Sequence, residues 1–113
     1  MYLETAQAIE HDNVTDAELR EAFRNDQGRG EYIILSRDGR KGQHYIQAAG
    51  EMDDPNYTLE YREGDNEHHF RADGEYTKAQ VEQAFLSYLN NDDRWRTDYP
   101  WSRITIKPWW KFW

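Results

Sequence analysis

The stretch YTKAQVEQAFLSYLNN (residues 76–91) predicts a complete helix with its start and stop signals. Thr77 and Gln80 have the spacing of a capping box, in which each side chain accepts a hydrogen bond from the other residue's backbone N–H. The asparagines of residues 90–91 are expected to end the helix. The apolar positions between them recur at helical spacing, which predicts one buried stripe: Val81, Ala84, Phe85, Tyr88 and Leu89.

A second helix start with the same chemistry occurs at residues 14–23, VTDAELREAF. Thr15 and Glu18 predict another capping box. Apolar residues flank and follow it at the spacing of a hydrophobic staple and a helix face: Val14, Leu19, Ala22 and Phe23. We expect this helix to end at the glycines of residues 28 and 30.

Four short segments between the helices predict β-strands, over residues 31–37, 43–49, 57–62 and 67–72. Their short connections favour antiparallel neighbours. The predicted fold class is α+β: an antiparallel β-meander of about four to five strands, packed on one face by two amphipathic helices. Residues 2–9 are a candidate for an edge strand, and Ile104 and Ile106 for another. We expect a single domain over residues 1–106 and an aromatic, basic C-terminal tail over residues 107–113.

Composition excludes several classes of protein. The chain has 113 residues, 22 of them acidic and 14 basic, and no cysteine, which excludes a disulfide scaffold, a cysteine zinc site and a thiol nucleophile. No apolar run is long enough to span a bilayer and no secretory signal is evident, so we expect a cytoplasmic protein. The net charge of −8 disfavours nucleic acid as a direct partner and favours a basic protein.

The sequence offers few candidates for catalysis or metal binding. Adjacent His68 and His69 would point to opposite faces of a strand, so we expect His68 on the core side and His69 in solvent, with no shared metal. No phosphate-binding loop, serine elbow or metalloprotease motif occurs. The expectation is therefore a non-enzyme without a cofactor. A small enzyme remains an alternative, with Tyr45, His44 or His68 as acid or base.

Acidic turns are the first candidates for a partner-binding surface. Two patches are expected, at opposite ends of the sheet, because successive turns of a meander alternate between its ends. The patches consist of Glu51, Asp53 and Asp54 in one turn and Glu63, Asp65 and Glu67 in the next. Either patch could bind a basic protein, or the acids could simply keep the domain soluble.

The tryptophans allow two interpretations. Trp95 and Trp101 follow the second predicted helix, and they could pack this segment back over the core or contact a partner. The tail KPWWKFW (residues 107–113) combines four aromatic residues with two lysines. This composition fits an interfacial anchor, a docking tail, packing against the domain or self-association.

Several motifs together resemble the Imm1-like immunity-protein family of bacterial polymorphic toxin systems. They are the strand pair GEYIIL and QHYIQ, the LEY and FRA strands, a helix of the form VxxAFxxYL, and NDD followed by a downstream tryptophan. The similarity covers about residues 31–101. It implies a protein that binds and blocks a cognate toxin, often a nucleic-acid deaminase, with Trp95 or Trp101 at the family's C-terminal tryptophan position. The tail after Ile106 departs from the family pattern.

The charge and the resemblance favour the same function. Toxins that act on nucleic acid tend to have basic grooves, which an acidic protein can occlude. The leading expectation is a non-enzymatic inhibitor that neutralises such a toxin. The alternative from another class is a small adaptor that self-associates through its aromatic C-terminus.

Overall fold

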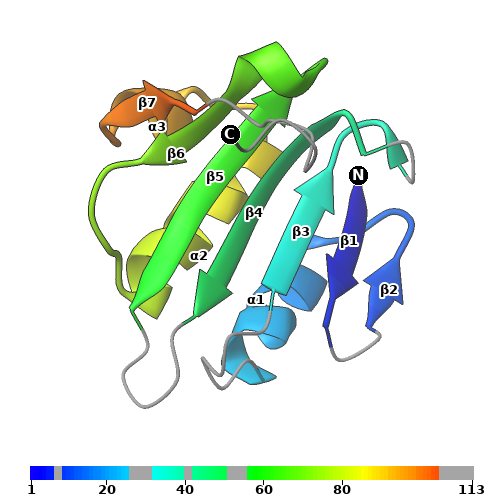
Figure 1. The fold of residues 1–113 in the computed structure, drawn as a ribbon. Coiled ribbons are helices and arrows are strands. Elements are labelled where there is room, and N and C mark those ends of the chain that lie inside the picture. Colours follow the sequence, from blue (N-terminus) through cyan, green and yellow to red (C-terminus); the bar gives the residue numbers. More distant parts are fainter. Residues whose placement is uncertain (7–8, 26–31, 40–41, 51–55, 105–113) are drawn as a thin grey trace.

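A computed structural model describes residues 1–6, 9–25, 32–39, 42–50 and 56–104 of the chain. Its centre is one antiparallel sheet in the order β2-β1-β3-β4-β5-β6-β7, with the main helices on one face (Figure 1). The strands are β1 Tyr2–Thr5, β2 Glu10–His11, β3 Tyr32–Ser36, β4 His44–Gly50, β5 Tyr57–Glu63, β6 His69–Ala72 and β7 Trp101–Arg103. The helices are α1 Asp16–Asn25, η2 Asn66–His68, α2 Lys78–Leu89 and the single turn α3 Arg94–Thr97.

The predicted α+β class with an antiparallel sheet is confirmed, but the expected number of elements is wrong. Among the described residues, the sheet has seven strands instead of four to five, and α3 is a third α-helix. The first strand is not at the edge, because the chain reverses after Thr5 and β2 pairs with its outer side. Ile104 follows the edge strand β7, and Ile106 lies outside the described residues, as do residues 28 and 30 and the tail at 107–113.

One row of apolar side chains crosses the sheet on the face toward the helices. Direct pairing partners on five neighbouring strands form it: Leu3, Leu35, Ile46, Tyr61 and Phe70. The first four are buried and the last packs against the core. Because side chains alternate between the two faces of a strand, this register brings these five apolar positions to the same side of the sheet.

Both predicted capping boxes are present. Glu18 N–H donates to Thr15 Oγ1 at 3.2 Å, and Thr15 N–H donates to Glu18 Oε1 at 3.0 Å. Thr77 and Gln80 make the equivalent pair of bonds at the start of α2. The end of α2 also lies where the asparagines predicted it, with Asn91 in the left-handed region at φ 58°.

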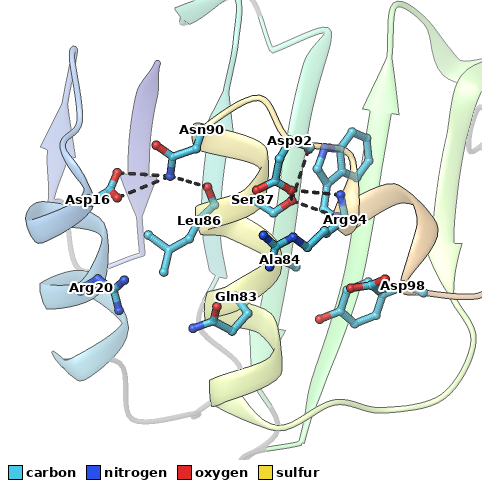
Figure 2. A pocket seen from close by; sticks show the side chains of 12 residues that line it. Asp16, Arg20, Gln83, Ala84, Leu86, Ser87, Asn90, Asp92, Arg94 and Asp98 are labelled. Atoms are coloured by element: carbon cyan, nitrogen blue, oxygen red, sulfur yellow. Dashed lines mark hydrogen bonds between the residues drawn. The ribbon is translucent and has the colours of Figure 1, made fainter.

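The buried surface of α2 is wider than the predicted stripe. Leu86 and Ser87 are buried in addition to the stripe residues on the sheet side. The reason is tertiary: α2 lies between α1 and α3, so its flanks are covered as well as its inner face (Figure 2). On the α1 side, the Phe23 and Phe85 rings meet edge to face at 5.0 Å.

Trp95 is the centre of an aromatic cluster in the core. Its side chain is 1% exposed, and its ring centroid lies 4.9 Å from that of Tyr61, 5.1 Å from that of Tyr88 and 6.2 Å from that of Trp101. Trp101 Nε1 donates to the Trp95 carbonyl oxygen at 3.1 Å. The two tryptophans therefore pack the segment after α2 back over the core, which was one of the two interpretations of the sequence.

The structure places His69 on the sheet face opposite the helices, as expected, but the expected burial of the histidine pair is wrong. His69 is buried, while His68 is exposed in η2, with Asp65 capping this turn by accepting from the backbone N–H of His68. The strand therefore begins only at His69, and the His69 side chain lies on the sheet face opposite the helices. Arg62 Nε donates to His69 Nδ1 at 3.4 Å, so Nε2 carries the proton and donates to Glu60 Oε1 at 2.7 Å. Two partners satisfy this imidazole, which explains why it tolerates burial.

Within the described residues, no helix is both long and apolar enough to cross a membrane. The longest described helix, α2, has 12 residues. This length is well short of the roughly 20 residues that a membrane-spanning helix needs.

Removal of either helix cap is expected to destabilise the domain. Thr77→Ala should lower the free energy of unfolding by about 1 kcal/mol, because it leaves an N-terminal helix N–H without its acceptor. Thr15→Ala should have an effect of the same order. Urea denaturation followed by circular dichroism measures both. Thr77→Ser is the control that keeps the hydroxyl, and an equal loss in this variant would contradict the role of the cap.

Truncation of the central tryptophan should be far more costly. Trp95→Ala is expected to lower the free energy of unfolding by about 3–5 kcal/mol through the cavity it leaves. Trp95→Phe should cost only about 1–2 kcal/mol, because it keeps an aromatic ring and removes an indole N–H that is buried without an acceptor. Equal losses for the two variants in urea denaturation would contradict a packing role for the ring.

Candidate functional site

A groove of about 350 Å³ lies on the outer surface of the helical layer, between α1 and the α2–α3 segment (Figure 2). Its floor is formed in part by the buried side chains of Ala84 and Leu86. Polar and charged side chains from all three helices and their connections surround it: Asp16, Arg20, Gln83, Ser87, Asn90, Asp92, Arg94 and Asp98. The groove therefore exposes both acidic and basic side chains. Its volume is at the lower end of the range for ligand sites.

The connection from α2 to α3 is held by one serine. The Ser87 hydroxyl donates to Asp92 Oδ1 and accepts from Trp95 N–H at 3.0 Å, while Arg94 N–H donates to the same Asp92 oxygen at 3.0 Å. Figure 2 shows these bonds on one side of the groove. They fix the position from which α3 begins and therefore where the Arg94 side chain lies.

The same bonds limit the acid–base and nucleophilic chemistry of Ser87 and Asp92. The hydrogen bond from Ser87, followed by that from Arg94 N–H, holds the pKa of Asp92 below its usual value. A carboxylate with a lowered pKa is a weak base, and the Ser87 oxygen already serves as donor and acceptor. The arrangement therefore suits a structural clamp better than an activated nucleophile.

The α1 wall of the groove is fixed to α2 by an amide. Asn90 Nδ2 donates to the Leu86 carbonyl oxygen at 2.8 Å and lies 3.4 Å from both carboxylate oxygens of Asp16. One turn further along α1, Arg20 is half exposed and lies 3.9 Å from Glu82. Asp16 and Arg20, which have opposite charges, therefore border the groove from the same face of α1.

A second cleft, of about 320 Å³, lies on the other side of α1, against β2. Apolar side chains line it (Ile9, Ala17 and Ala22), together with His11, Glu18 and Glu21. His11 Nδ1 is 2.8 Å from Glu18 Oε2, which ties β2 to the helix. The hydrogen bond from the Thr15 backbone is the main reason that the pKa of Glu18 is lowered, so this carboxyl is charged at neutral pH. An apolar cleft with carboxylates beside it fits a long basic side chain.

The structure describes only one of the two predicted acidic patches. Glu51, Asp53 and Asp54 lie outside the described residues. In the other turn, Glu63 accepts from Arg96 and Asp65 lies 2.8 Å from His68 Nδ1, while Glu67 is exposed. Two of the three carboxylates in this turn therefore have partners within the domain. Glu63 pairs with a residue 33 positions downstream, a pairing that turn composition could not indicate.

The remaining candidates lie in separate surroundings. Trp95 lines the groove but is buried, and Trp101 is half-buried beside it. Tyr45 lies on the sheet face opposite the helices, where burial raises the pKa of its hydroxyl. His44 Nδ1 is 3.4 Å from Asp38, and His68 is bound to Asp65. The two histidines thus each have their own carboxylate partner.

Sequence reasoning missed both cavities. Residues far apart in the chain form the groove: Asp16 and Asn90 are 74 positions apart. The segment DDRWR (residues 92–96) supplies Asp92 and Arg94 to the groove, whereas from the sequence only its tryptophan was considered as a binding residue. The described residues contain no group of three or more histidine, cysteine, aspartate or glutamate side chains placed to hold a metal ion.

Comparisons with protein-family models, curated proteins and solved structures found no match for the chain. The Imm1-like resemblance therefore remains a prediction from sequence motifs.

Acidification should destabilise the domain, in part through Asp92. A carboxyl whose pKa is lowered in the folded state contributes stability at pH values above its unfolded pKa, about 3.9, and loses this contribution as the pH falls below it. We expect the urea midpoint to fall between pH 5 and pH 3, and Asp92→Asn to reduce the fall. Asp93→Asn is the matched control with the same change of charge. An unchanged fall in Asp92→Asn would contradict this contribution.

Proposed function

We propose that the chain is a non-catalytic inhibitor of the immunity-protein kind, which binds a toxin domain with a basic surface. The observation that carries the proposal is the cleft between β2 and α1. Its lining combines Ile9, Ala17 and Ala22 with Glu18 and Glu21. A lysine or arginine of a partner would bury its aliphatic stem on the apolar residues and place its charged end at the carboxylates.

The surroundings of the cleft support a basic partner. Residues 1–25 contain six carboxylates against two arginines. The side chains of Glu10, Asp12, Asp16 and Glu21 are exposed along β2 and α1. A concentration of one charge on a protein that is already at −8 attracts an oppositely charged partner and accelerates association.

The groove chemistry supports binding over catalysis. Its serine and the adjacent carboxylate are engaged in holding α3, whereas exposed charged and amide groups surround them. Such groups recognise a partner surface by hydrogen bonds and charge. A toxin that acts on nucleic acid must itself bind phosphates, so an acidic inhibitor is suited to occupy the same basic surface.

The test is co-expression with the toxin domain encoded by the gene adjacent to that of this chain. The chain should restore growth of cells that produce the toxin, and the purified proteins should bind with an affinity that falls as salt increases. Asp12→Lys/Glu21→Lys should weaken binding about tenfold or more, because it reverses charge around the cleft and leaves the capping box intact.

The matched control is Glu75→Lys/Asp93→Lys, the same change of charge at two exposed positions away from the cleft. It should keep most of the affinity at moderate ionic strength. Equal weakening by the two double variants would refute the role of the cleft. No adjacent toxin gene, or no recovery of growth, would refute the inhibitor proposal itself.

A further inference from the structure

A further cavity lies on the sheet face opposite the helices, the face turned toward the viewer in Figure 1. Its volume is about 430 Å³, larger than that of the groove or of the β2–α1 cleft. Side chains from β1, β2, β3 and β4 line it, together with Gly39 and Gly42 of the turn after β3. The lining that the structure describes contains two carboxylates, those of Glu4 and Glu10, and no basic side chain. The described walls of the cavity therefore carry a net negative charge.

The register of the sheet builds the floor of this cavity from two neighbouring rows of directly paired residues. The first row crosses β1, β3 and β4: Tyr2, Ser36 and Tyr45. The second row crosses β2, β1, β3 and β4: Glu10, Glu4, Ile34 and Gln47. Neighbouring strands lie about 4.8 Å apart, so the two tyrosines of the first row are separated by roughly 10 Å at their Cα atoms. The small Ser36 side chain between them leaves a hollow with a tyrosine on either side.

The Ser36 hydroxyl is an unused hydrogen-bonding group at the bottom of this hollow. The residue is 3% exposed, and its side chain makes no hydrogen bond to any residue that the structure describes. A buried hydroxyl without a partner is unfavourable, because it has given up its hydrogen bonds to water. A polar group that enters the cavity would restore one of them.

The two carboxylates lie at directly paired positions of the sheet. Glu4 and Glu10 are opposite each other on β1 and β2, and like charges at such positions repel. Among the described residues, the Glu4 carboxylate has no ion-pair partner. Since both side chains line the cavity, a positive group bound there would offset their repulsion.

The combination of groups favours a guanidinium over other cations. A guanidinium is flat, stacks on aromatic rings and donates hydrogen bonds in several directions within its plane. The hollow provides tyrosine rings for stacking, carboxylates for the charge, and the Ser36 hydroxyl and Gln47 amide oxygen as further acceptors. An ammonium is a compact, strongly hydrated charge that uses such a set less fully.

The position of β2 favours a protein as the source of this group. Glu10 lines the cavity and the next residue, His11, lines the β2–α1 cleft, because successive residues of a strand point to opposite faces. The cavity and the cleft therefore lie on either side of one edge strand. A basic protein that contacts this edge reaches both of them.

We propose that the cavity binds an arginine side chain of a protein partner, with the guanidinium group between Tyr2 and Tyr45 and its charge facing Glu4 and Glu10. The inference rests on the proposed function only for the identity of the partner. Residues 40 and 41, an arginine and a lysine between the two lining glycines, lie outside the described residues, and the test includes them as competing occupants.

The test uses the full ¹⁵N-labelled chain and the capped peptide acetyl-Gly-Arg-Gly-amide. The backbone N–H signals of Ser36 and Tyr45 should shift and saturate as this peptide is added. The same peptide with citrulline, which keeps the shape of arginine without its charge, should bind about tenfold more weakly or not at all. The peptide with lysine should also bind more weakly than the arginine peptide.

Variants of the lining locate the binding site. Glu4→Gln should weaken binding of the arginine peptide about tenfold, and Ser36→Val should abolish it by filling the hollow. Glu75→Gln removes the same charge at an exposed position away from the cavity and should leave binding unchanged. The double variant Arg40→Gln/Lys41→Gln should bind as the natural chain does. The backbone amide spectrum of each variant shows that its fold is intact.

Three results would overturn the site: no saturable shift with the arginine peptide, binding of the citrulline or lysine peptide as tight as that of arginine, or an equal effect of Glu75→Gln. Much tighter binding by Arg40→Gln/Lys41→Gln would overturn the partner in favour of the chain's own basic side chains. Because the titration needs no toxin, it separates the two proposals. Peptide binding without growth rescue leaves the cavity and removes the toxin as partner, whereas growth rescue without peptide binding leaves the inhibitor and removes the cavity.

Discussion

The register of the sheet is the constraint on which the rest of the structure depends. Leu3, Leu35, Ile46, Tyr61 and Phe70 are direct neighbours across five strands, so their side chains form one apolar row. A slip of one residue in any strand would turn its apolar positions toward the face without helices. The helices have one continuous surface on which to pack only because each strand keeps this alignment.

Both candidate sites follow from how the helices cover that surface. The central helix α2 lies between α1 and α3, and the shallow spaces along its outer side become the groove. The clamp made by Ser87 and Asp92 sets the start of α3, and the amide of Asn90 links the end of α2 to the side of α1. Groups that stabilise the packing of α1, α2 and α3 therefore also line the groove.

Short-range sequence signals predicted much of the fold. Features that depend on contacts between residues far apart in the chain could not be predicted. Capping boxes at Thr15 and Thr77 and the alternation of the strands are readable within a few residues of sequence. The prediction for His68 was wrong because a cap by Asp65 holds it in η2, and the burial of His69 depends on Arg62 and Glu60 of a neighbouring strand. The extra strands β2 and β7 are too short for a periodic signal. The groove could not be predicted because its lining residues come from α1, α2, α3 and the segments that follow them, which only the tertiary packing brings together.

The order of the strands has a consequence for how the chain folds during synthesis. Strands β3 to β6 are neighbours in both sequence and space, so they can pair as they leave the ribosome. Helix α2, which covers the middle of the sheet, is made only after all four of them. Until its buried residues, up to Tyr88, have emerged, the nascent sheet exposes part of its apolar row to other chains. The period of greatest risk of aggregation therefore falls between the emergence of β6 and that of α2.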